Sequence, residues 1–469
     1  MSVPSWQFLV FVLVGAVMFN AALGQWWRST VWLALNLAFV WSFAHGVGPL
    51  LPLVGFLAIG YVGIAAAHTR RAWTAPTSIV LVLALFIWLK RYSFIPESLL
   101  LPPGYMTVGL SYIFFRVMHL VVDSGHGDTE RIRIIPFLNF TLNFPAFISG
   151  PIQRREDYEA NGALSLTLPD IGWAAWRMVL GAFKVLILSV ALHTAQLDLL
   201  AGLTPDLRMG QRVLTGALVV VLYPLFLYAN FSGYTDFVIG VARLYRLRLP
   251  ENFDQPFGAT NFINFWSRWH ISLSQWLRSY VFNPLLITWM RRSKSARLRQ
   301  YPSVIALFVT FFLVGAWHGQ TSEFLFFGIL QGGGVAGNRL YQVAMTRRLT
   351  ASGYERLCVN PAYRAVARGL TFSWFAFTLL WFWASWQQIG ELAERLRLEG
   401  SVLALVGTVG VASAVLMTPE ACGTYADWFG RLLRSRYTRT VFASAMILVL
   451  AVGGLVMDLS SPEIVYKQF

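Results

Sequence analysis

The sequence predicts an all-α protein that crosses a membrane many times. Of its 469 residues, 56% are apolar and 13% are charged, and that charged share is about half of the share in an ordinary soluble domain. Apolar stretches recur from residues 6–23 to residues 441–456. A helix needs about 20 apolar residues to cross the hydrocarbon core, and an unpaired strand cannot cross lipid. We therefore expect roughly 11–14 helices, some re-entrant or interfacial, in a single membrane-embedded domain over residues 1–469.

The apolar runs support these helices in order along the chain. The first run has no basic segment before it and no clear small-residue cleavage pattern after it, so we interpret it as a retained helix and not a signal peptide. Runs much shorter than about 20 residues need polar extensions or re-entrant packing. The runs after the first cover residues 31–44, 50–67, 79–89, 106–122, 171–191, 213–231, 304–316, 324–340, 370–386, 402–416 and 441–456.

The charge balance favours a membrane surface as the partner. Lys and Arg outnumber Asp and Glu by 37 to 22, which gives a net charge of +15. In a soluble protein this surplus would suggest nucleic acid. Here the basic residues lie between apolar runs, as at Arg347-Arg348, and cytoplasmic anchoring of loops explains them. We expect membrane lipid and no nucleic acid. The two cysteines, Cys358 and Cys422, form no CxxC pattern, so we expect no metal site.

The middle of the chain is its least lipid-like part. Residues 250–256 are too polar and turn-rich to cross a bilayer. Residues 263–282 then carry an apolar stripe at helical spacing, which predicts one amphipathic helix that lies across or dips into the membrane. Residues 136–153 are apolar but broken by Pro and Gly. Because non-spanning backbone at membrane depth must be surrounded by protein or water, these segments predict an interior reaction chamber. The stripe consists of Phe265, Trp269, Leu273, Trp276 and Tyr280.

Two Trp-His pairs are the first candidates for chemistry, Trp269-His270 and Trp317-His318. An imidazole changes its charge near neutral pH, and ionisable groups among membrane spans are functional candidates by default. His318 suits a general base that takes the proton from an alcohol attacking an activated acyl group. It equally suits a histidine that merely joins two helices by a hydrogen bond. For His270, on sequence position alone, we favour a surface or packing role over a functional one.

Further polar residues are candidates for substrate binding or support. Gly315 and Gly319 flank the second pair and permit close approach of backbone or ligand. Asp236 follows a long apolar run and is suited to orient a histidine or bind a cation, although a helix cap explains it too. Arginines can hold donor phosphates in bidentate fashion, and loop anchoring is their plain alternative. The candidates are Asn230, Tyr234, Asp236, Asn252, Gln255, Trp269, Ser274, Arg278, Trp317 and Arg154.

Five motifs, in this order, resemble the membrane-bound O-acyltransferase superfamily. The closest resemblance is to its bacterial branch, typified by alginate O-acetyltransferase and the teichoic-acid D-alanyl transferase. The motif-bearing core covers about residues 136–342, and the chain departs from the alginate pattern at Ser267 and Ser279. The motifs are Phe-Pro-Ala-Phe-Ile-Ser-Gly-Pro-Ile-Gln-Arg at 144–154, Asn-Phe-Ser-Gly-Tyr-Thr-Asp at 230–236, Glu-Asn-Phe-Asp-Gln-Pro-Phe at 251–257, the block at 265–285, and Gly-Ala-Trp-His-Gly at 315–319.

The resemblance implies a fold that encloses a central tunnel, with the two motif histidines near its middle. By motif match, His318 corresponds to the family's catalytic histidine. His270 corresponds to the second motif residue, which is often Asn or Asp in eukaryotic members. The resemblance implies no permanently bound cofactor, and an acyl thioester, either acetyl-CoA or an acyl carrier, as co-substrate. It also implies a multi-pass protein of the bacterial inner membrane.

The expected function is transfer of an acyl group, with acetyl as the first expectation. The donor is a cytoplasmic thioester. The acceptor is a hydroxyl of an extracytoplasmic polysaccharide, or a partner such as a periplasmic SGNH/GDSL-type acyltransferase that passes the group on. One alternative is D-alanyl transfer from a carrier-protein thioester to teichoic acid. A glycan or lipid transporter and a non-catalytic scaffold remain alternatives of other classes, although no internal repeat is visible.

Overall fold

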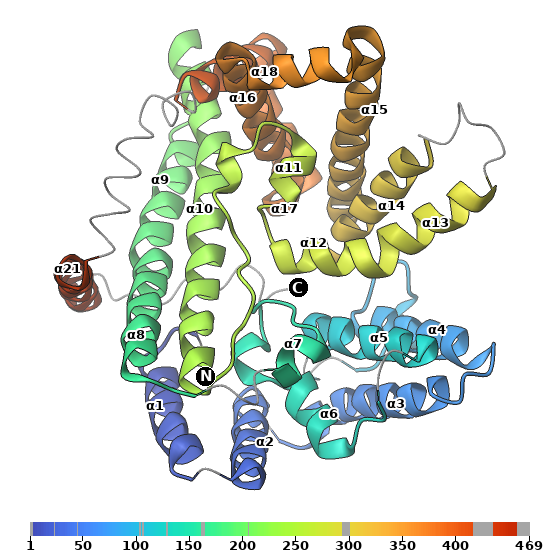
Figure 1. The fold of residues 1–469 in the computed structure, drawn as a ribbon. Helices are drawn as coiled ribbons and strands as arrows, with labels where there is room; N and C mark the ends of the chain where they lie inside the picture. Colours follow the sequence, from blue (N-terminus) through green and yellow to red (C-terminus); the bar gives the residue numbers. More distant parts are fainter. Residues whose placement is uncertain are drawn as a thin grey trace. The chain divides into compact units, whose positions relative to one another are not determined.

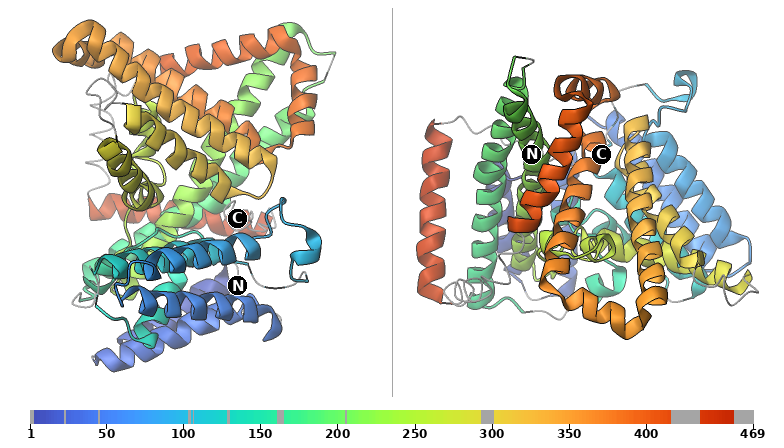
Figure 2. Two further views of the ribbon diagram at one scale, coloured as in Figure 1. Left: turned by 90° about the vertical axis from the view of Figure 1, so that its right-hand side faces the viewer. Right: turned by 90° about the horizontal axis from the view of Figure 1, so that it is seen from above.

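The computed structural model describes residues 3–22, 24–44, 46–102, 105, 107–127, 130–160, 165–204, 206–292, 301–415 and 435–456 (Figures 1 and 2). The chain forms two compact units. The first comprises Met1–Val185, Phe231–Glu251 and Gly454–Phe469; the second comprises Leu186–Asn230 and Asn252–Gly453. Cys422 lies outside the described residues, and Cys358 is a free thiol.

The first unit contains α1 (Trp6–Asn20), α2 (Gln25–Trp41), η1 (Gly48–Leu50), α3 (Leu51–Ala67), α4 (Thr74–Leu89), η2 (Glu97–Leu99), α5 (Leu110–His126), α6 (Ile134–Thr141), η3 (Phe144–Ala146), α7 (Arg155–Ala160) and α8 (Leu168–Phe183). Helices α3, α4 and α5 pack side by side (Figure 2). The π-helix η5 (Lys184–Leu188) and the long helix α10 (Met209–Leu244) each contribute residues to both units.

A buried arginine organises the non-spanning segment of the first unit. Residues 136–153 fold into α6, the short η3 and irregular backbone, as the Pro and Gly residues predict. Arg116 on α5, only 1% exposed, donates to the carbonyl of Thr141 at 2.8 Å and to that of Ala146 at 2.5 Å. Irregular backbone exposes carbonyls that must be satisfied when they are buried. The guanidinium, with several donors in a fixed geometry, meets this need at two places.

The second unit contains α9 (Ser189–Ala201), η6 (Pro256–Gly258), α11 (Phe262–Trp266), α12 (Ile271–Leu277), η7 (Arg278–Phe282), α13 (Asn283–Arg292), α14 (Tyr301–His318), α15 (Ser322–Val359), α16 (Pro361–Thr378), α17 (Leu380–Trp383), α18 (Trp386–Val415) and most of α21 (Arg436–Val456). Helices α14 and α15 lie side by side (Figure 1). A Cβ atom on Gly315 would collide with the backbone of Gly328. Glycine at 315 therefore allows the close approach that the sequence predicts.

The helices confirm an all-α, multi-pass membrane protein. Within the described part of the chain, six helical segments are long and apolar enough to cross a membrane. Four shorter apolar helices accompany them. The six segments are Gly48–Ala67, Leu168–Ala201, Met209–Leu244, Tyr301–His318, Pro361–Trp383 and Trp386–Val415.

Candidate active site

The segment that carries the first Trp-His pair is broken, and the prediction of one continuous helix over residues 263–282 is wrong. Helix α11 ends at Trp266 and α12 begins at Ile271. Between them His270 adopts a left-handed backbone conformation, with φ 45° and ψ 54°. A left-handed residue cannot continue a right-handed helix. The apolar stripe remains buried across the break at Phe265, Trp269, Leu273 and Trp276.

A short polar loop pairs with the break and fixes it. Phe253 and Trp269 form an antiparallel β-bridge, and their rings pack edge to face at 5.0 Å. The Asp254 N–H donates to the Arg268 carbonyl at 3.0 Å, and the Ile271 N–H donates to the Asn252 carbonyl at 3.0 Å. The paired residues lie about 15 or more positions apart in the chain. The apolar periodicity within either segment therefore cannot reveal the pairing.

Asn252 caps α12 from outside the helix. Its Oδ1 atom accepts the N–H of Ser272 at 3.1 Å and the hydroxyl of Ser272 at 2.7 Å. The first N–H groups of a helix have no partner within the helix, and a side-chain oxygen normally satisfies one of them. Asn252 is 1% exposed and meets this need with both its carbonyl and its side chain. The structure thus gives Asn252, predicted as a substrate-binding or supporting residue, a supporting role directly beside His270.

Trp317 packs against both candidate histidines. His318 ends α14 and is 2% exposed, and His270 is 1% exposed. The Trp317 ring centroid lies 4.7 Å from that of His318 and 6.3 Å from that of His270. Both imidazoles therefore contact one indole. Two further rings pack on His318, Phe382 at 5.0 Å and Phe327 at 6.0 Å.

This environment keeps an imidazole neutral. Burial lowers the pKa of His270 from its ordinary 6.5 to about 3, because the charged form loses its hydration. A pKa this low makes His270 a weaker base than a free imidazole, because a general base works best when its pKa lies near the working pH. The neutral ring can still accept a hydrogen bond from a hydroxyl group. His270 also has a left-handed backbone, and strained non-glycine residues cluster at functional sites. The environment therefore suits His270 to positioning a hydroxyl more than to removing its proton.

The other candidates of the second unit occupy different environments. Trp269 is 2% exposed and stacks on Phe265 at 5.7 Å, so it is a packing residue. The Ser274 hydroxyl donates to the Trp269 carbonyl at 3.5 Å, and Asn230 is fully buried on α10. Arg278 and Gln255 are exposed.

Three candidates belong to the first unit, where Asp236 forms an ion-pair network. Asp236 binds Arg177 and Lys184, each at 2.6 Å, and Arg177 also binds Glu251 at 2.7 Å. Tyr234 is 1% exposed and Arg154 is half-buried. We did not predict the cationic partners of Asp236. The available signal was the presence of Arg177 and Lys184 inside the apolar run 171–191, because charges in such runs are costly unless they are paired.

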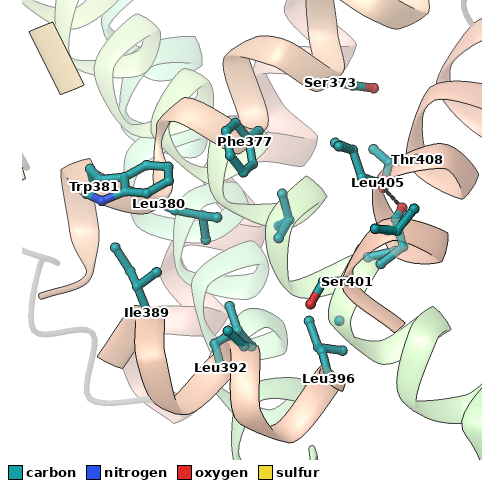
Figure 3. A pocket seen from close by; sticks show the side chains of 16 residues that line it. Ser373, Phe377, Leu380, Trp381, Ile389, Leu392, Leu396, Ser401, Leu405 and Thr408 are labelled. Atoms are coloured by element: carbon teal, nitrogen blue, oxygen red, sulfur yellow. Dashed lines mark hydrogen bonds between the residues drawn. The ribbon is translucent and has the colours of Figure 1, made fainter. Parts of the chain in front are cut away.

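An apolar cavity in the second unit lies apart from this chemistry. Its volume is about 260 Å³, and neither histidine lines it (Figure 3). The hydroxyls of Ser401 and Thr408 on its wall donate to carbonyls of their own helix. Leu380 and Trp381 on α17 line the cavity, whereas the next residue, Phe382, packs on His318. The cavity offers volume but no acid–base group. Among the described residues no cluster of His, Cys, Asp or Glu could hold a metal.

Comparison with known proteins places these motifs in a family. The chain is 27% identical over 436 residues to a probable alginate O-acetylase, AlgI, of Pseudomonas aeruginosa, covering 87% of this chain and 75% of that protein. It is 29% identical over 289 residues to the teichoic acid D-alanyltransferase of Streptococcus thermophilus, covering 59% and 68%. It is 30% identical over 227 residues to the Bacillus subtilis teichoic acid D-alanyltransferase, covering 47% of this chain and 56% of that protein. The model of the membrane-bound O-acyltransferase family matches residues 8–382, and the chain belongs to this family.

Proposed function

We propose that this protein is a membrane O-acyltransferase in which His318 is the general base and His270 assists. The observation that supports this most is the pair of buried imidazoles whose rings both pack on the ring of Trp317. The family membership supports acyl transfer as the reaction class. The donor is an acyl thioester, acetyl-CoA or an acyl carrier, and the acceptor is a hydroxyl.

The proposed step balances as a simple acyl transfer. The acceptor oxygen attacks the thioester carbonyl carbon while His318 takes the hydroxyl proton. The carbon–sulfur bond then breaks, and the protonated imidazole returns the proton to the leaving thiolate. Such positioned proton transfer is worth about 10²–10⁴-fold. The rings of Trp317, Phe327 and Phe382 exclude water, which would otherwise compete as a nucleophile.

Acetyl is the proposed acyl group, and a polysaccharide outside the bacterial inner membrane is the proposed final acceptor. The AlgI relative, which matches along 87% of this chain, favours this assignment. A periplasmic SGNH-type partner that receives the group and passes it on fits the same chemistry. The D-alanyl alternative is favoured by the two relatives that are D-alanyltransferases at 29% and 30% identity.

The test replaces the proposed base. We expect His318→Ala, at equal membrane abundance, to lower thiol release from acetyl-CoA by membrane vesicles by about 10²–10⁴-fold. Base-labile acetyl on surface polysaccharide should fall in parallel. His193→Ala is the matched control, because His193 is half-buried in the same unit and stacks on Phe226 at 4.5 Å. A scaffold or a transporter would tolerate His318→Ala.

A second arm identifies the acyl group. The same vesicles receive a carrier protein charged with D-alanine in place of acetyl-CoA. Thiol release from the carrier protein and none from acetyl-CoA would overturn the acetyl assignment and leave the proposal of acyl transfer intact. Full activity of His318→Ala with both donors would overturn the proposed function itself.

A further inference from the structure

Gln331 is a fully buried amide at the centre of the second unit. It lies on α15 and is 0% exposed. The Trp266 Nε1–H donates to its Oε1 atom at 3.3 Å, and its own Nε2–H donates to the Thr378 hydroxyl oxygen at 2.8 Å. The Thr378 hydroxyl donates in turn to the Phe375 carbonyl at 2.8 Å. One amide therefore joins α11, α15 and α16 by hydrogen bonds.

Each residue of this network lies four positions along the chain from a residue of the candidate site. Gln331 follows Phe327 by four residues on α15, which places the two on one face of that helix. Thr378 precedes Phe382 by four residues, where α16 gives way to α17. The rings of Phe327 and Phe382 pack on His318 and also on each other, at 5.3 Å.

The third residue stands in the same relation to the other histidine. Trp266 precedes His270 by four residues and is the last residue of α11, just before the break. It is 4% exposed, and its ring packs on Phe311 of α14 at 5.0 Å. The segment that leads into His270 is therefore anchored to α15 through Gln331.

We propose that Gln331 is a positioning residue that holds the backbones on which both imidazoles depend. This inference rests on the proposed function. The hydrogen bonds of Gln331 reach Trp266 and Thr378, so it acts on the imidazoles through Trp266, Phe327 and Phe382. Among apolar neighbours a hydrogen bond competes with little water, so a satisfied buried network specifies one arrangement of helices. Misplacement of reacting groups by about 1 Å is enough to cost as much as 10²-fold in rate.

The amide is suited to this task by its two-sided chemistry. Its oxygen accepts a hydrogen bond from the Trp266 indole, which can only donate. Its nitrogen donates to the Thr378 hydroxyl oxygen, because the proton of that hydroxyl is already donated to a carbonyl. Methionine matches glutamine in length and offers neither function. A protonated glutamic acid offers both, whereas an ionised one has no donor.

The experiment uses the full-length protein in membrane vesicles, with acetyl-CoA as the probe and a parallel arm with D-alanyl carrier protein. We expect Gln331→Met to lower kcat by about tenfold at nearly unchanged KM for the thioester. Gln331→Glu should retain activity at acidic pH and lose it as the pH rises, because ionisation removes the donor. The wild type should not show this added pH dependence.

Two further variants separate positioning from general stability. Gln196→Met is the matched control, because Gln196 is 2% exposed in the same unit and donates to the Val219 carbonyl at 3.2 Å. Thr378→Val should lower kcat as Gln331→Met does, and the double variant should be no worse than either, as in a coupled pair. Equal kcat values for Gln331→Met and Gln196→Met, or full additivity with Thr378→Val, would overturn the inference. Retained activity of His318→Ala would instead overturn the proposed function.

Discussion

Two clusters of ionisable groups, one in each unit, have different environments. In the first unit, Asp236 lies between Arg177 and Lys184 at 2.6 Å from each. In the second unit, His270 and His318 lie among aromatic rings. The first unit holds the ion pairs Arg155–Glu159, Arg177–Asp236, Arg177–Glu251, Lys184–Asp236 and Arg243–Asp170.

The difference separates groups that hold a structure from groups that can react. A paired carboxylate and its cations stay charged, and removing one partner strands a charge in a poor solvent. Burial instead lowers the pKa of His270, so its imidazole stays neutral near pH 7 and can accept a hydrogen bond. Both arrangements place ionisable groups among membrane helices, but the first holds charges in fixed pairs and the second holds a neutral ring.

The largest effect is expected when the ion-pair network around Asp236 is broken. Asp236→Ala removes the carboxylate that Arg177 and Lys184 share, although Arg177 keeps Glu251. Such a loss costs about 3–5 kcal/mol for fully buried pairs, and we expect less here because the side chains are 14–22% exposed. We expect a strong fall in membrane abundance and in the thermal midpoint of the detergent-solubilised protein. Glu159→Gln is the control, because Glu159 is 51% exposed in its pair with Arg155, and exposed pairs contribute about 0–1 kcal/mol. Equal effects of the two variants would contradict a structural role for Asp236.

The next effect tests the second arrangement at His270. His270→Ala should lower the acyl-transfer rate by about 10²-fold, near the lower end for a positioned acid–base group. Membrane abundance should fall little compared with Asp236→Ala. His270→Asn should keep the fold better than alanine, since asparagine tolerates a left-handed backbone. If His270→Ala lost abundance and kept its rate per molecule, His270 would be a structural residue.

A smaller effect concerns Asn252, which caps α12 directly after His270. Asn252→Ala removes the side-chain cap of α12, and lost caps cost about 0.5–2 kcal/mol. Because the cap borders His270, we expect a lower transfer rate with a modest loss of stability. Asn360→Ala supplies the comparison, since Asn360 caps α16 by accepting the Tyr363 N–H at 3.1 Å and lies outside the candidate site. The stability losses should be similar, and only Asn252→Ala should slow transfer.

The smallest effect is a dependence of stability on pH. Burial lowers the folded-state pKa of His270 to about 3, below the ordinary value of 6.5. The unfolded chain therefore binds more protons between these values, and the folded state loses stability as the pH falls below 6.5. The slope is at most about 1.4 kcal/mol per pH unit for this one group. His270→Asn should remove this part of the slope in thermal melts recorded from pH 7 to pH 5, and an unchanged slope would count against the buried neutral state.

The features that could be predicted, such as the apolar helices and the close approach at Gly315, depend on residues near one another in the sequence. The apolar runs became helices because burying or embedding apolar surface requires little more than composition and length. Gly315 and the glycine-bounded second pair indicated the close approach of α14, which the contact with Gly328 confirms. The break at His270 escaped prediction, because the stripe from Phe265 to Trp276 stays buried whether or not the helix is continuous.

Pairings between distant segments could not be predicted in this way. The Asn252 cap, the Gln331 amide and the cations around Asp236 all meet partners from other elements. A polar residue in an apolar run signals that a partner must exist but does not say which residue it is. For the same reason the role of Gln331 could not be predicted from the sequence, although its side chain is as deeply buried as that of any core residue.

The left-handed backbone at His270 also limits which amino acids can occupy that position. Among non-glycine residues, Asn, Asp and His are several-fold enriched in this conformation, and β-branched residues are nearly excluded from it. The family resemblance places Asn or Asp at the same position in many eukaryotic members. The backbone geometry thus restricts position 270 to a few kinds of side chain, and the favoured ones, Asn, Asp and His, are all polar. Replacement of His270 by Asn or Asp should therefore preserve the helix break.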